Sequence, residues 1–286
     1  MNILIADSGA TKTHWELVNT TDKSHTTFYT QGISPFYFNE TEISEILTKE
    51  LLTQNDFSTV EKIFFYGTGC SQPDKIAIVR NALANTLNTE NVMVEHDLLA
   101  AAKGTCGNNK GITCILGTGS NSCLYDGKNI IDNVPSLGFL LGDEGSGAWF
   151  GRKILQAYFY RELPAELHSA FENKFPFSKA EILNEVYGVK NPNSYVATFM
   201  PFISENNEHP FIKNLLSAGF QEFLTRTVLK YSEHENLPVH FIGSVAFLNK
   251  EILVAALHQF NLTAGNIFKS PMQGLLQYHL ENIQHE

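Results

Sequence analysis

Short apolar runs that end at small or acidic residues recur along the chain, and they predict buried strands. Residues 2–7 (NILIAD) form such a run, and the alternating segment 14–19 (HWELVN) predicts a second strand after a turn of small residues. Further strands are predicted at about 25–30, 61–66, 91–95, 113–115 and 238–243.

Helices are predicted where apolar residues return every three or four positions. The clearest case is 39–54, which has an Asn cap, early acidic residues and apolar positions 43, 46, 47 and 51. Strands that alternate with helices are typical of an α/β fold. Further helices are predicted at about 73–88, 98–103, 148–160 and 249–260, in the tail after Pro271, and over most of 161–236.

The segment 113–127 contains the most informative turn. A short strand leads into Gly117-Thr118-Gly119-Ser120-Asn121, and a second strand leads out to the turn pair Asp126-Gly127. Glycines one residue apart let the backbone bend tightly and approach a ligand, and successive N–H groups at such a bend form a concave anion site. An ordinary hairpin turn is the alternative.

The N-terminus repeats this design. Asp7 ends the first predicted strand and is followed by the turn Ser8-Gly9-Ala10-Thr11-Lys12-Thr13. A carboxylate at the mouth of a phosphate-binding turn can hold Mg²⁺ against the phosphates, directly or through water, and Lys12 adds a positive charge. The alternative is a capped turn with a solvated aspartate. Two such hairpins, one in each half of the chain, favour phosphate binding.

Asp97 stands between a predicted strand and a predicted helix. The carboxyl ends of parallel strands are where α/β folds place their ligands, so this carboxylate is a candidate catalytic group. An aspartate at a helix start also caps the helix, and that alternative stays open. The neighbouring His96 is either a partner of Asp97 or a structural residue.

Polar residues framed by glycine or proline mark further loops. Ser34 lies in the loop 32–36, and Thr68 follows the strand at 61–66. Gly142-Asp143-Glu144-Gly145 places two acidic residues where they can enter a cleft or favour a helix N-terminus. Gly243-Ser244-Val245 joins a strand to a helix, as nucleotide-binding turns do.

Composition argues against several function classes. The 286 residues carry a net charge of −10 without a block of Lys or Arg, which argues against nucleic acid and anionic membranes as partners. No apolar run approaches the ~20 residues of a membrane span, and the start does not resemble a secretory signal, so a cytoplasmic protein is expected. Cys70, Cys106, Cys114 and Cys123 form no close pair, which favours buried free thiols over zinc or iron–sulfur sites.

The order of these motifs resembles that of the sugar kinase and actin-like ATPase superfamily, and within it the N-acetylglucosamine kinase and BadF/BadG/BcrA/BcrD-type ATPase family. Six segments span nearly the whole chain in the family's order. They are IADSGATKT at 5–13, EHDLLAAAKG at 95–104, ILGTGSNS at 115–122, LGDEGSGAWFGR at 141–152, FIGSVA at 241–246 and PMQGLL at 271–276.

The resemblance implies an α/β actin-like ATPase fold, with two RNase-H-like domains around an ATP cleft. The first domain would comprise 1–105 joined by the C-terminal helix at about 272–286, and the second would comprise 106–271. The two glycine turns would grip the phosphates of ATP from opposite sides. Nucleotide contacts are thereby expected at Ser8, Gly9, Thr11, Lys12, Thr13, Gly117, Thr118, Gly119, Ser120, Gly243, Ser244 and Val245.

By the same resemblance, Asp97 is the base for the sugar hydroxyl. The family often carries Asn before the proline of the loop 32–35, and Ser34 stands there instead. Homodimers are common among such kinases. Sugar contacts are expected at Ser34, Thr68, Asp97, Asn121, Gly142, Asp143 and Glu144.

The resulting hypothesis is an ATP-dependent kinase that converts an amino sugar, N-acetylglucosamine in the first place, to its 6-phosphate. Glucosamine and N-acetylmuramic acid are alternative substrates, because selectivity depends on a few polar contacts. A BadF-type ATPase that drives a conformational change in a partner enzyme is the alternative from another class. Relatives of that kind use cysteine-ligated iron–sulfur clusters, and the cysteine spacing argues against one here.

Overall fold

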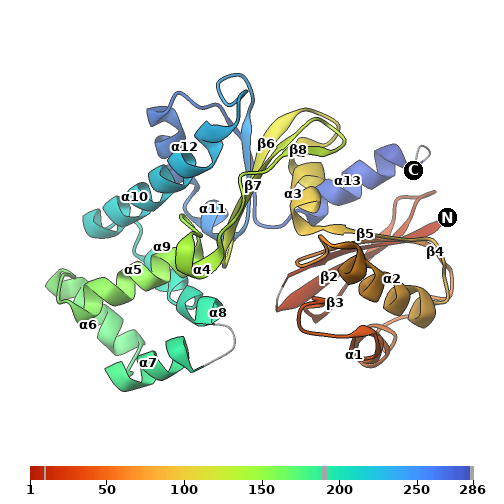
Figure 1. Cartoon of the computed structure of the whole chain (residues 1–286), viewed down its shortest axis with the longest axis horizontal. Helices are drawn as coiled ribbons and strands as arrows, with labels where there is room; N and C mark the ends of the chain where they lie inside the picture. Colours follow the sequence, from red (N-terminus) through yellow and green to blue (C-terminus); the bar gives the residue numbers. More distant parts are fainter. Residues whose placement is uncertain (10, 189–191, 284–286) are drawn as a thin grey trace. The chain divides into compact units, whose positions relative to one another are not determined.

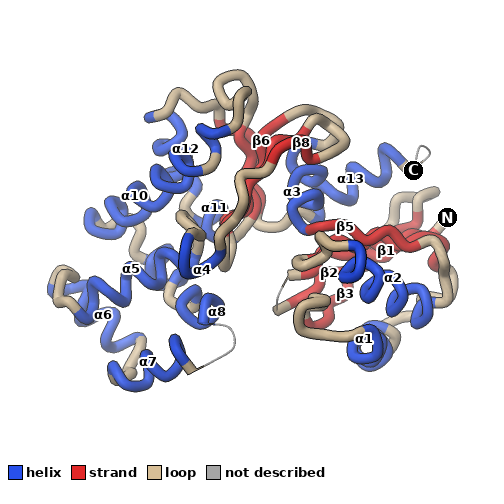
Figure 2. Tube along the Cα trace, in the orientation of Figure 1, coloured by secondary structure: helices blue, strands red, loops and turns tan. Residues whose placement is uncertain are grey.

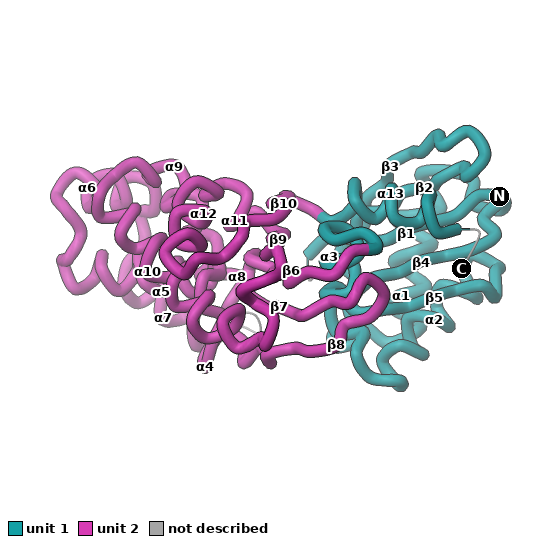
Figure 3. Tube along the Cα trace, turned by 90° about the horizontal axis from the view of Figure 1, so that it is seen from above, with its two compact units in different colours: residues 1–108, 271–286 teal, residues 109–270 magenta. Residues whose placement is uncertain are grey.

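The computed structural model describes residues 1–9, 11–188 and 192–283. Ala10 of the first turn, 189–191 of the predicted helical stretch and 284–286 of the predicted last helix lie outside the described residues. The chain divides into two compact units, shown in two colours in Figure 3. Unit 1 comprises Met1–Asn108 and Pro271–Glu286, and unit 2 comprises Asn109–Ser270.

Unit 1 contains the strands β1 (Asn2–Ser8), β2 (Lys12–Asn19), β3 (His25–Gln31), β4 (Val60–Gly67) and β5 (Val92–His96) (Figure 1). They form one sheet in the order β3-β2-β1-β4-β5. The β1–β2 pair is the predicted antiparallel hairpin, and β3 pairs antiparallel with β2. β4 and β5 run parallel to β1, so the carboxyl ends of these three strands lie together.

Helices cover both faces of this sheet (Figure 2). Alternate residues of β1 point to opposite faces, and this period of two assigns Leu4 to one apolar core and Ile3 and Ile5 to the other. The first core includes residues of α1, η1 and α2, and the second includes residues of α3 and α13. These helices are α1 (Glu40–Ile46), η1 (Leu47–Leu51), α2 (Pro73–Leu87), α3 (Asp97–Cys106) and α13 (Met272–Asn282).

The predicted helix 39–54 differs from the structure in its second half. Asn39 and Glu42 form a capping box at its start, as the sequence suggests. The α-helix then ends at Ile46 and continues as the π-helix η1. At its end, Glu50 accepts the backbone N–H of Gln31 at 2.7 Å. The π-helical segment thus places a side chain against the outer edge of β3.

Helices α3 and α13 approach each other at two glycines. A Cβ on Gly274 would lie 1.8 Å from the carbonyl oxygen of Gly104, and a Cβ on Gly104 would lie 2.7 Å from that of Pro271. Only glycine allows backbones to approach so closely. The crossing holds the last helix of the chain against the helix that begins at Asp97.

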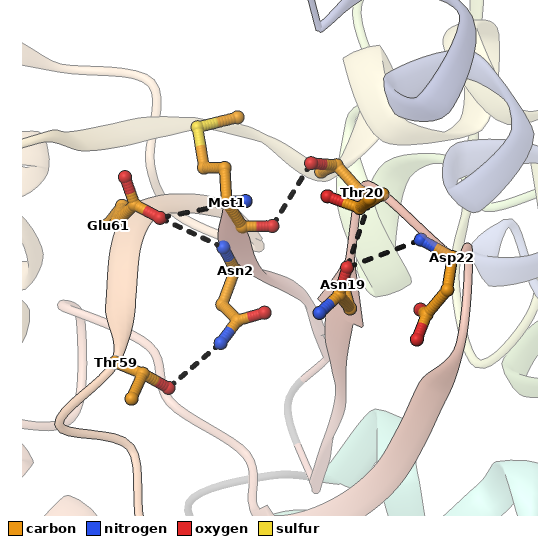
Figure 4. A network of polar contacts seen from close by, with 8 residues as sticks. Met1, Asn2, Asn19, Thr20, Asp22, Thr59 and Glu61 are labelled. Atoms are coloured by element: carbon orange, nitrogen blue, oxygen red, sulfur yellow. Dashed lines mark hydrogen bonds and ion pairs between the residues drawn. The ribbon is translucent and has the colours of Figure 1, made fainter.

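A polar network closes the end of the sheet where β1 begins (Figure 4). Glu61 accepts the backbone N–H of Asn2 at 3.2 Å and lies 3.8 Å from the amino group of Met1. The carbonyl oxygen of Met1 in turn accepts the hydroxyl of Thr20 at 3.0 Å. This network lies at the opposite end of β1 from Asp7, so it stabilises the sheet away from the candidate site.

Unit 2 repeats the sheet topology of unit 1. Its strands are β6 (Gly111–Leu116), β7 (Ser120–Tyr125), β8 (Ile130–Asp132), β9 (Val239–Ile242) and β10 (Ala264–Phe268). They pair in the order β10-β9-β6-β7-β8, with the β6–β7 hairpin antiparallel and β9 and β10 parallel to β6. In each unit the first strand is therefore central. The next two strands of the chain lie on one side of it, and the two strands parallel to it lie on the other.

The rest of unit 2 is mostly helical, as predicted for 161–236. Its largest apolar core combines strand residues such as Leu116 with aromatic side chains such as Phe150, Phe171 and Phe220. Among the residues that the structure describes, none belongs to a helix long and apolar enough to span a membrane. The helices are α4 (Gly138–Leu141), α5 (Gly147–Phe159), α6 (Ala165–Lys174), α7 (Lys179–Tyr187), α8 (Pro192–Ala197), α9 (Met200–Glu205), α10 (Pro210–Arg226), η2 (Val228–Lys230), α11 (Ser244–Leu248) and α12 (Lys250–Gln259).

Candidate active site

Two aspartates lie at the carboxyl ends of the parallel strands of unit 1. Asp7 is the penultimate residue of β1, and Asp97 is the first residue of α3, directly after β5. β4 lies between these strands, with Tyr66 opposite Asp7 on one side and opposite Glu95 on the other. The sheet register therefore brings the two predicted catalytic carboxylates to the same end of the sheet.

Asp7 carries a carboxylate whose pKa lies well above its ordinary value. Burial, and then the charge of Asp97, raises the pKa of Asp7 to about 7, against the opposing charge of His14. The influence of Asp97 means that the two carboxylates share one electrostatic environment. A cation at this point would relieve the repulsion between them.

The donor set fits Mg²⁺ held jointly with phosphates. In kinases this ion is bound by one or two carboxylates, water and substrate phosphates rather than by a cage of protein ligands. Asp7 supplies such a carboxylate, and the nearby charge of Asp97 strengthens the attraction for a cation. Within the described ranges, no three His, Cys, Asp or Glu side chains gather as an all-protein metal site.

The start of α3 is capped by His96 and not by Asp97. The Nδ1 atom of His96 accepts the backbone N–H of Leu98 at 3.1 Å, and His96 has the extended backbone of an N-cap. The same Nδ1 atom lies 2.8 Å from Oδ1 of Asp97. Because the cap is filled by its neighbour, the carboxylate of Asp97, 29% exposed, is left for other contacts.

The turn after β1 is held by two buried hydroxyls. The hydroxyl oxygens of Ser8 and Thr13 lie 2.7 Å apart, and each lies 3.0 Å from a backbone carbonyl oxygen, that of Ile33 for Ser8 and that of Gln31 for Thr13. Because each hydroxyl has one hydrogen to donate, two of these three contacts are hydrogen bonds at any one time. Their side chains are fully buried. Both hydroxyls are therefore engaged within the protein, and nucleotide contacts at these two residues stay a prediction.

Other residues of that turn face solvent. Gly9 donates its N–H to the carbonyl oxygen of Lys12 at 3.0 Å, and Thr11 and Lys12 are exposed. The ammonium of Lys12 lies 3.5 Å from the ring centre of Tyr29, a cation–π contact that orients the charge. The sequence analysis did not find Tyr29, because an exposed aromatic on a predicted strand has no local signal for such a role.

Besides Asp97, the sugar contacts predicted in unit 1 are Ser34 and Thr68, which lie near the same end of the sheet. Ser34 is only 1% exposed, and its hydroxyl oxygen would lie 3.2 Å from a Cβ on Gly69. Thr68 is half-buried and donates its N–H to the carbonyl oxygen of Ser8 at 3.0 Å. Ser34 is thus covered by the protein, while Thr68 keeps part of its surface open.

In unit 2, the glycine turn is anchored to the start of α5. The N–H of Gly147 binds the carbonyl oxygen of Gly117 at 2.8 Å, and the N–H of Ala148 binds that of Thr118 at 3.0 Å. Thr118 is exposed, and Gly117 and Gly119 are half-buried. Strand, turn and strand are therefore formed as predicted, and a helix start fixes the turn.

Asp143 braces this turn. It has a φ of +58°, which aspartate tolerates better than most residues, and it is 8% exposed. Its carboxylate accepts the backbone N–H of Ser120 at 3.1 Å and the hydroxyl of Ser136 at 3.4 Å. Burial raises the pKa of Asp143, although these two hydrogen bonds oppose the rise.

The remaining predicted sugar contacts of unit 2 surround one cavity of about 340 Å³. Asn121 uses its side-chain oxygen to accept the N–H of Ser122 at 2.9 Å. Glu144 is paired with Arg226 at 3.3 Å, a partner from α10 that the sequence analysis missed because nothing local links the two segments. The cavity is lined by Ser120, Asn121, Gly142, Asp143, Glu144 and Arg226, among others.

A second, smaller cavity of about 190 Å³ joins the predicted nucleotide segments of unit 2. Gly243 has a φ of +121°, and a Cβ there would lie 2.2 Å from the carbonyl oxygen of Leu116, so only glycine fits. This close approach places the start of α11 beside the glycine turn. The lining includes Gly117, Thr118, Gly147, Ser244 and Val245.

No protein-family model matches the chain, and no curated protein matches its sequence. Solved structures do. A Porphyromonas gingivalis protein named "Putative N-acetylglucosamine Kinase" is 42% identical over 98% of this chain and 99% of its own, with a TM-score of 0.94. The chain belongs to this N-acetylglucosamine kinase family.

Two further structures share the fold. A Chromobacterium violaceum protein, also named "Putative N-acetylglucosamine Kinase", is 18% identical over 97% of this chain and 98% of its own, with a TM-score of 0.73. A ROK family glucokinase from Streptomyces griseus was solved with glucose and AMPPNP. It is 15% identical over 97% of this chain and 98% of its own, with a TM-score of 0.56. The actin-like sugar kinase fold predicted from six motifs is confirmed.

Proposed function

We propose that this sugar kinase transfers the γ-phosphoryl group of ATP to the 6-hydroxyl of N-acetylglucosamine, with Asp97 as general base. The observation that carries the proposal is the pairing of Asp97 with Asp7 at the end of the unit 1 sheet, in a chain of this family. One carboxylate can accept the alcohol proton while the other holds the cation of the nucleotide.

The residues of the chain have distinct tasks in this reaction. Backbone N–H groups of the turns at 8–13 and 117–121 would bind phosphate oxygens, and Ser244 and Val245 would contact adenosine beside the glycine turn. Mg²⁺, held at Asp7, would neutralise charge on the phosphates. Positioning and charge stabilisation dominate phosphoryl transfer, because the protein has little covalent work to do.

Asp97 would accept the proton as the sugar oxygen attacks phosphorus. Its carboxylate is partly exposed and is free of the helix cap, so an alcohol can approach it. General-base catalysis of this kind contributes typically about 10²–10⁴-fold to rate. Sugar contacts would come from Thr68 and from the cavity beside Asn121, Asp143 and Glu144.

The test is a coupled ADP-release assay over N-acetylglucosamine, glucosamine, N-acetylmuramic acid and plain hexoses, with the phosphorylated carbon identified by NMR. Asp97→Asn should lower kcat by about 10²-fold or more while nucleotide binding is retained. Asp74→Asn, which removes an acid from the first turn of α2, is the matched control and should leave kcat unchanged. Near-normal turnover in Asp97→Asn contradicts the assignment of the base.

The same assay separates the alternatives. Preference for glucosamine or N-acetylmuramic acid changes the substrate and leaves the kinase assignment intact. ATP hydrolysis that no sugar affects, together with iron in the purified protein, would favour the BadF-type ATPase. Against this, the four cysteines are buried and divided between the two units, Cys70 and Cys106 in unit 1 and Cys114 and Cys123 in unit 2.

A further inference from the structure

One nitrogen atom of His96 faces two groups. Its Nδ1 lies 3.1 Å from the backbone nitrogen of Leu98, which donates its hydrogen, and 2.8 Å from Oδ1 of Asp97. A neutral imidazole nitrogen has one in-plane lone pair, or one hydrogen, but not both. The cap requires the lone pair, so the hydrogen of the neutral ring is on Nε2 while α3 is capped.

This arrangement leaves no hydrogen between His96 and an ionised Asp97. An Nδ1 lone pair and a carboxylate oxygen that face each other at 2.8 Å repel, and a proton placed between them converts the contact into a hydrogen bond. The imidazole side chain is 32% exposed, so the ring also has access to solvent. The pair is therefore built to receive one proton.

We propose that His96 is a positioning residue that receives the proton Asp97 takes from the substrate alcohol. The inference rests on the proposed function. The sugar O–H bond breaks as its oxygen bonds to the γ-phosphorus, ADP leaves with the electron pair of the broken P–O bond, and the proton goes to Asp97. It then passes to Nδ1, and the resulting imidazolium, held by the Asp97 carboxylate, later loses this Nδ1 proton to water, which restores the lone pair that caps α3.

The charged neighbours favour proton uptake by the ring. Burial lowers the pKa of His96, but the hydrogen bond and charge of Asp97 and the charge of Glu95 outweigh it, so the pKa is raised. Asp7 on β1 adds a further acidic group near Asp97. Cys70, after β4, stays a neutral thiol, because burial and the charge of Asp97 raise its pKa to about 12.

His96→Asn tests the role without removing the cap. The asparagine oxygen can accept the N–H of Leu98, and Asn is among the best N-cap residues, but it cannot take up a proton. We expect kcat for the preferred sugar to fall about 10- to 100-fold, with the sugar KM changed less than about threefold and the melting temperature retained.

The pH dependence of kcat gives a readout that a structural role would not move. With saturating Mg²⁺ and ATP, so that the cation at Asp7 keeps that carboxylate ionised, the activity of the unsubstituted enzyme should fall at acidic pH as His96 becomes protonated, because the charged ring cannot accept a second proton at Nδ1. In His96→Asn this acidic limb should move to lower pH. A limb that stays in place overturns the proposal, whether or not kcat changes.

If His96→Asn does not fold, the proposal can still be tested on the unsubstituted protein. ¹⁵N NMR of histidine-labelled protein should show Nδ1 of His96 without hydrogen in the neutral ring. A neutral ring that carries its hydrogen on Nδ1 overturns the proposal. The NMR measurement needs no turnover, so it tests the role of His96 alone. Whether a sugar is phosphorylated is tested separately by the ADP-release assay.

Discussion

The carboxylate of Asp143 accepts the backbone N–H of Ser120 at 3.1 Å, so an acid from one loop supports the glycine turn of another. A Cβ on Gly119 would lie 3.1 Å from both oxygens of this carboxylate. A side chain at residue 119 would therefore press against the carboxylate that supports the turn. This contact explains the second glycine of the turn by packing as well as by backbone freedom.

Gly119→Ala should consequently weaken unit 2. The new methyl group would push the Asp143 carboxylate by a few tenths of an ångström and strain its hydrogen bond to Ser120, and overpacking of this kind costs about 1–3 kcal/mol. A thermal-denaturation curve should show a melting temperature lower by several degrees. Gly117→Ala is the matched control, because a Cβ there meets no atom within 4 Å, and its melting temperature should not change. Equal losses in both variants would contradict the role of Asp143.

Asp7 should make the protein less stable as the pH rises. Its pKa is about 7 in the folded protein and near 3.8 in an unfolded chain, so between these values the folded state binds more protons than the unfolded state. The free energy of unfolding then falls with rising pH, by at most about 1.4 kcal/mol per pH unit. Asp7→Asn should remove this loss and be more stable than the unsubstituted protein at pH 8, while it loses kinase activity.

Urea denaturation at pH 4.5 and pH 8 measures the effect of Asp7→Asn. Asp22→Asn is the control, because Asp22 is exposed and hydrogen bonds from Ser24 lower its pKa. At pH 8, Asp22→Asn should not be more stable to urea than the unsubstituted protein. If Asp7→Asn and the unsubstituted protein have the same free energy of unfolding at both pH values, Asp7 is ionised well below pH 7, and the prediction is wrong.

Glu50 and Gln54 should keep the sheet of unit 1 from pairing with other chains. Glu50 accepts the N–H of Gln31, and Gln54 donates to the carbonyl oxygen of Tyr29 at 2.8 Å, so both occupy the open edge of β3. Exposed strand edges are templates for association. In Glu50→Ala/Gln54→Ala, sedimentation should show a higher, concentration-dependent mass than in the unsubstituted protein.

The neighbouring Lys49→Ala provides the control for this edge. Lys49 pairs with Glu45 on the exposed side of the same segment, and so it points away from the hydrogen bonds that Glu50 and Gln54 make to β3. The mass of Lys49→Ala in sedimentation should equal that of the unsubstituted protein, whether that protein is a monomer or the homodimer expected from the resemblance. A double variant with the same mass would mean that the edge is protected by other means.

Gly274→Ala should separate α13 from α3. A Cβ at this position would lie 1.8 Å from the carbonyl oxygen of Gly104, which cannot be accommodated without moving a helix. We expect a loss of about 3 kcal/mol or more in the stability of unit 1, measured by hydrogen exchange of β1 and β4 amides. Gln273→Ala, at an exposed position one residue earlier, should leave that exchange unchanged.

Local patterns in the sequence predict the elements that carry the candidate site. The two hairpins, the strand before Asp97 and the strand–turn–helix at Gly243 each combine an apolar run with a small-residue turn, and all four are present. Such features depend on neighbouring residues, so one sequence is enough to find them. The short strands β8 and β10 were missed, because their residues are half-buried or exposed and lack a clear apolar run.

Contacts between distant segments could not be predicted. Nothing near Asp143 indicates that its carboxylate supports Ser120, and nothing near Glu144 indicates Arg226 as its partner. The sequence also did not decide which residue caps α3, since His96 and Asp97 both suit a helix start. Only the folded geometry shows that the histidine takes the cap and that the aspartate does not.

The close crossing of α3 and α13 has a consequence for biosynthesis. Ile3, Ile5 and Phe64 share a core with Met272 and Leu275, yet these two groups leave the ribosome at opposite ends of translation. Until α13 emerges, only α3 covers this face of the nascent sheet, while all of unit 2 has already been synthesised in one stretch. The half that is made first is therefore finished after unit 2, and the part of its apolar face that α13 covers is a surface for chaperones in the meantime.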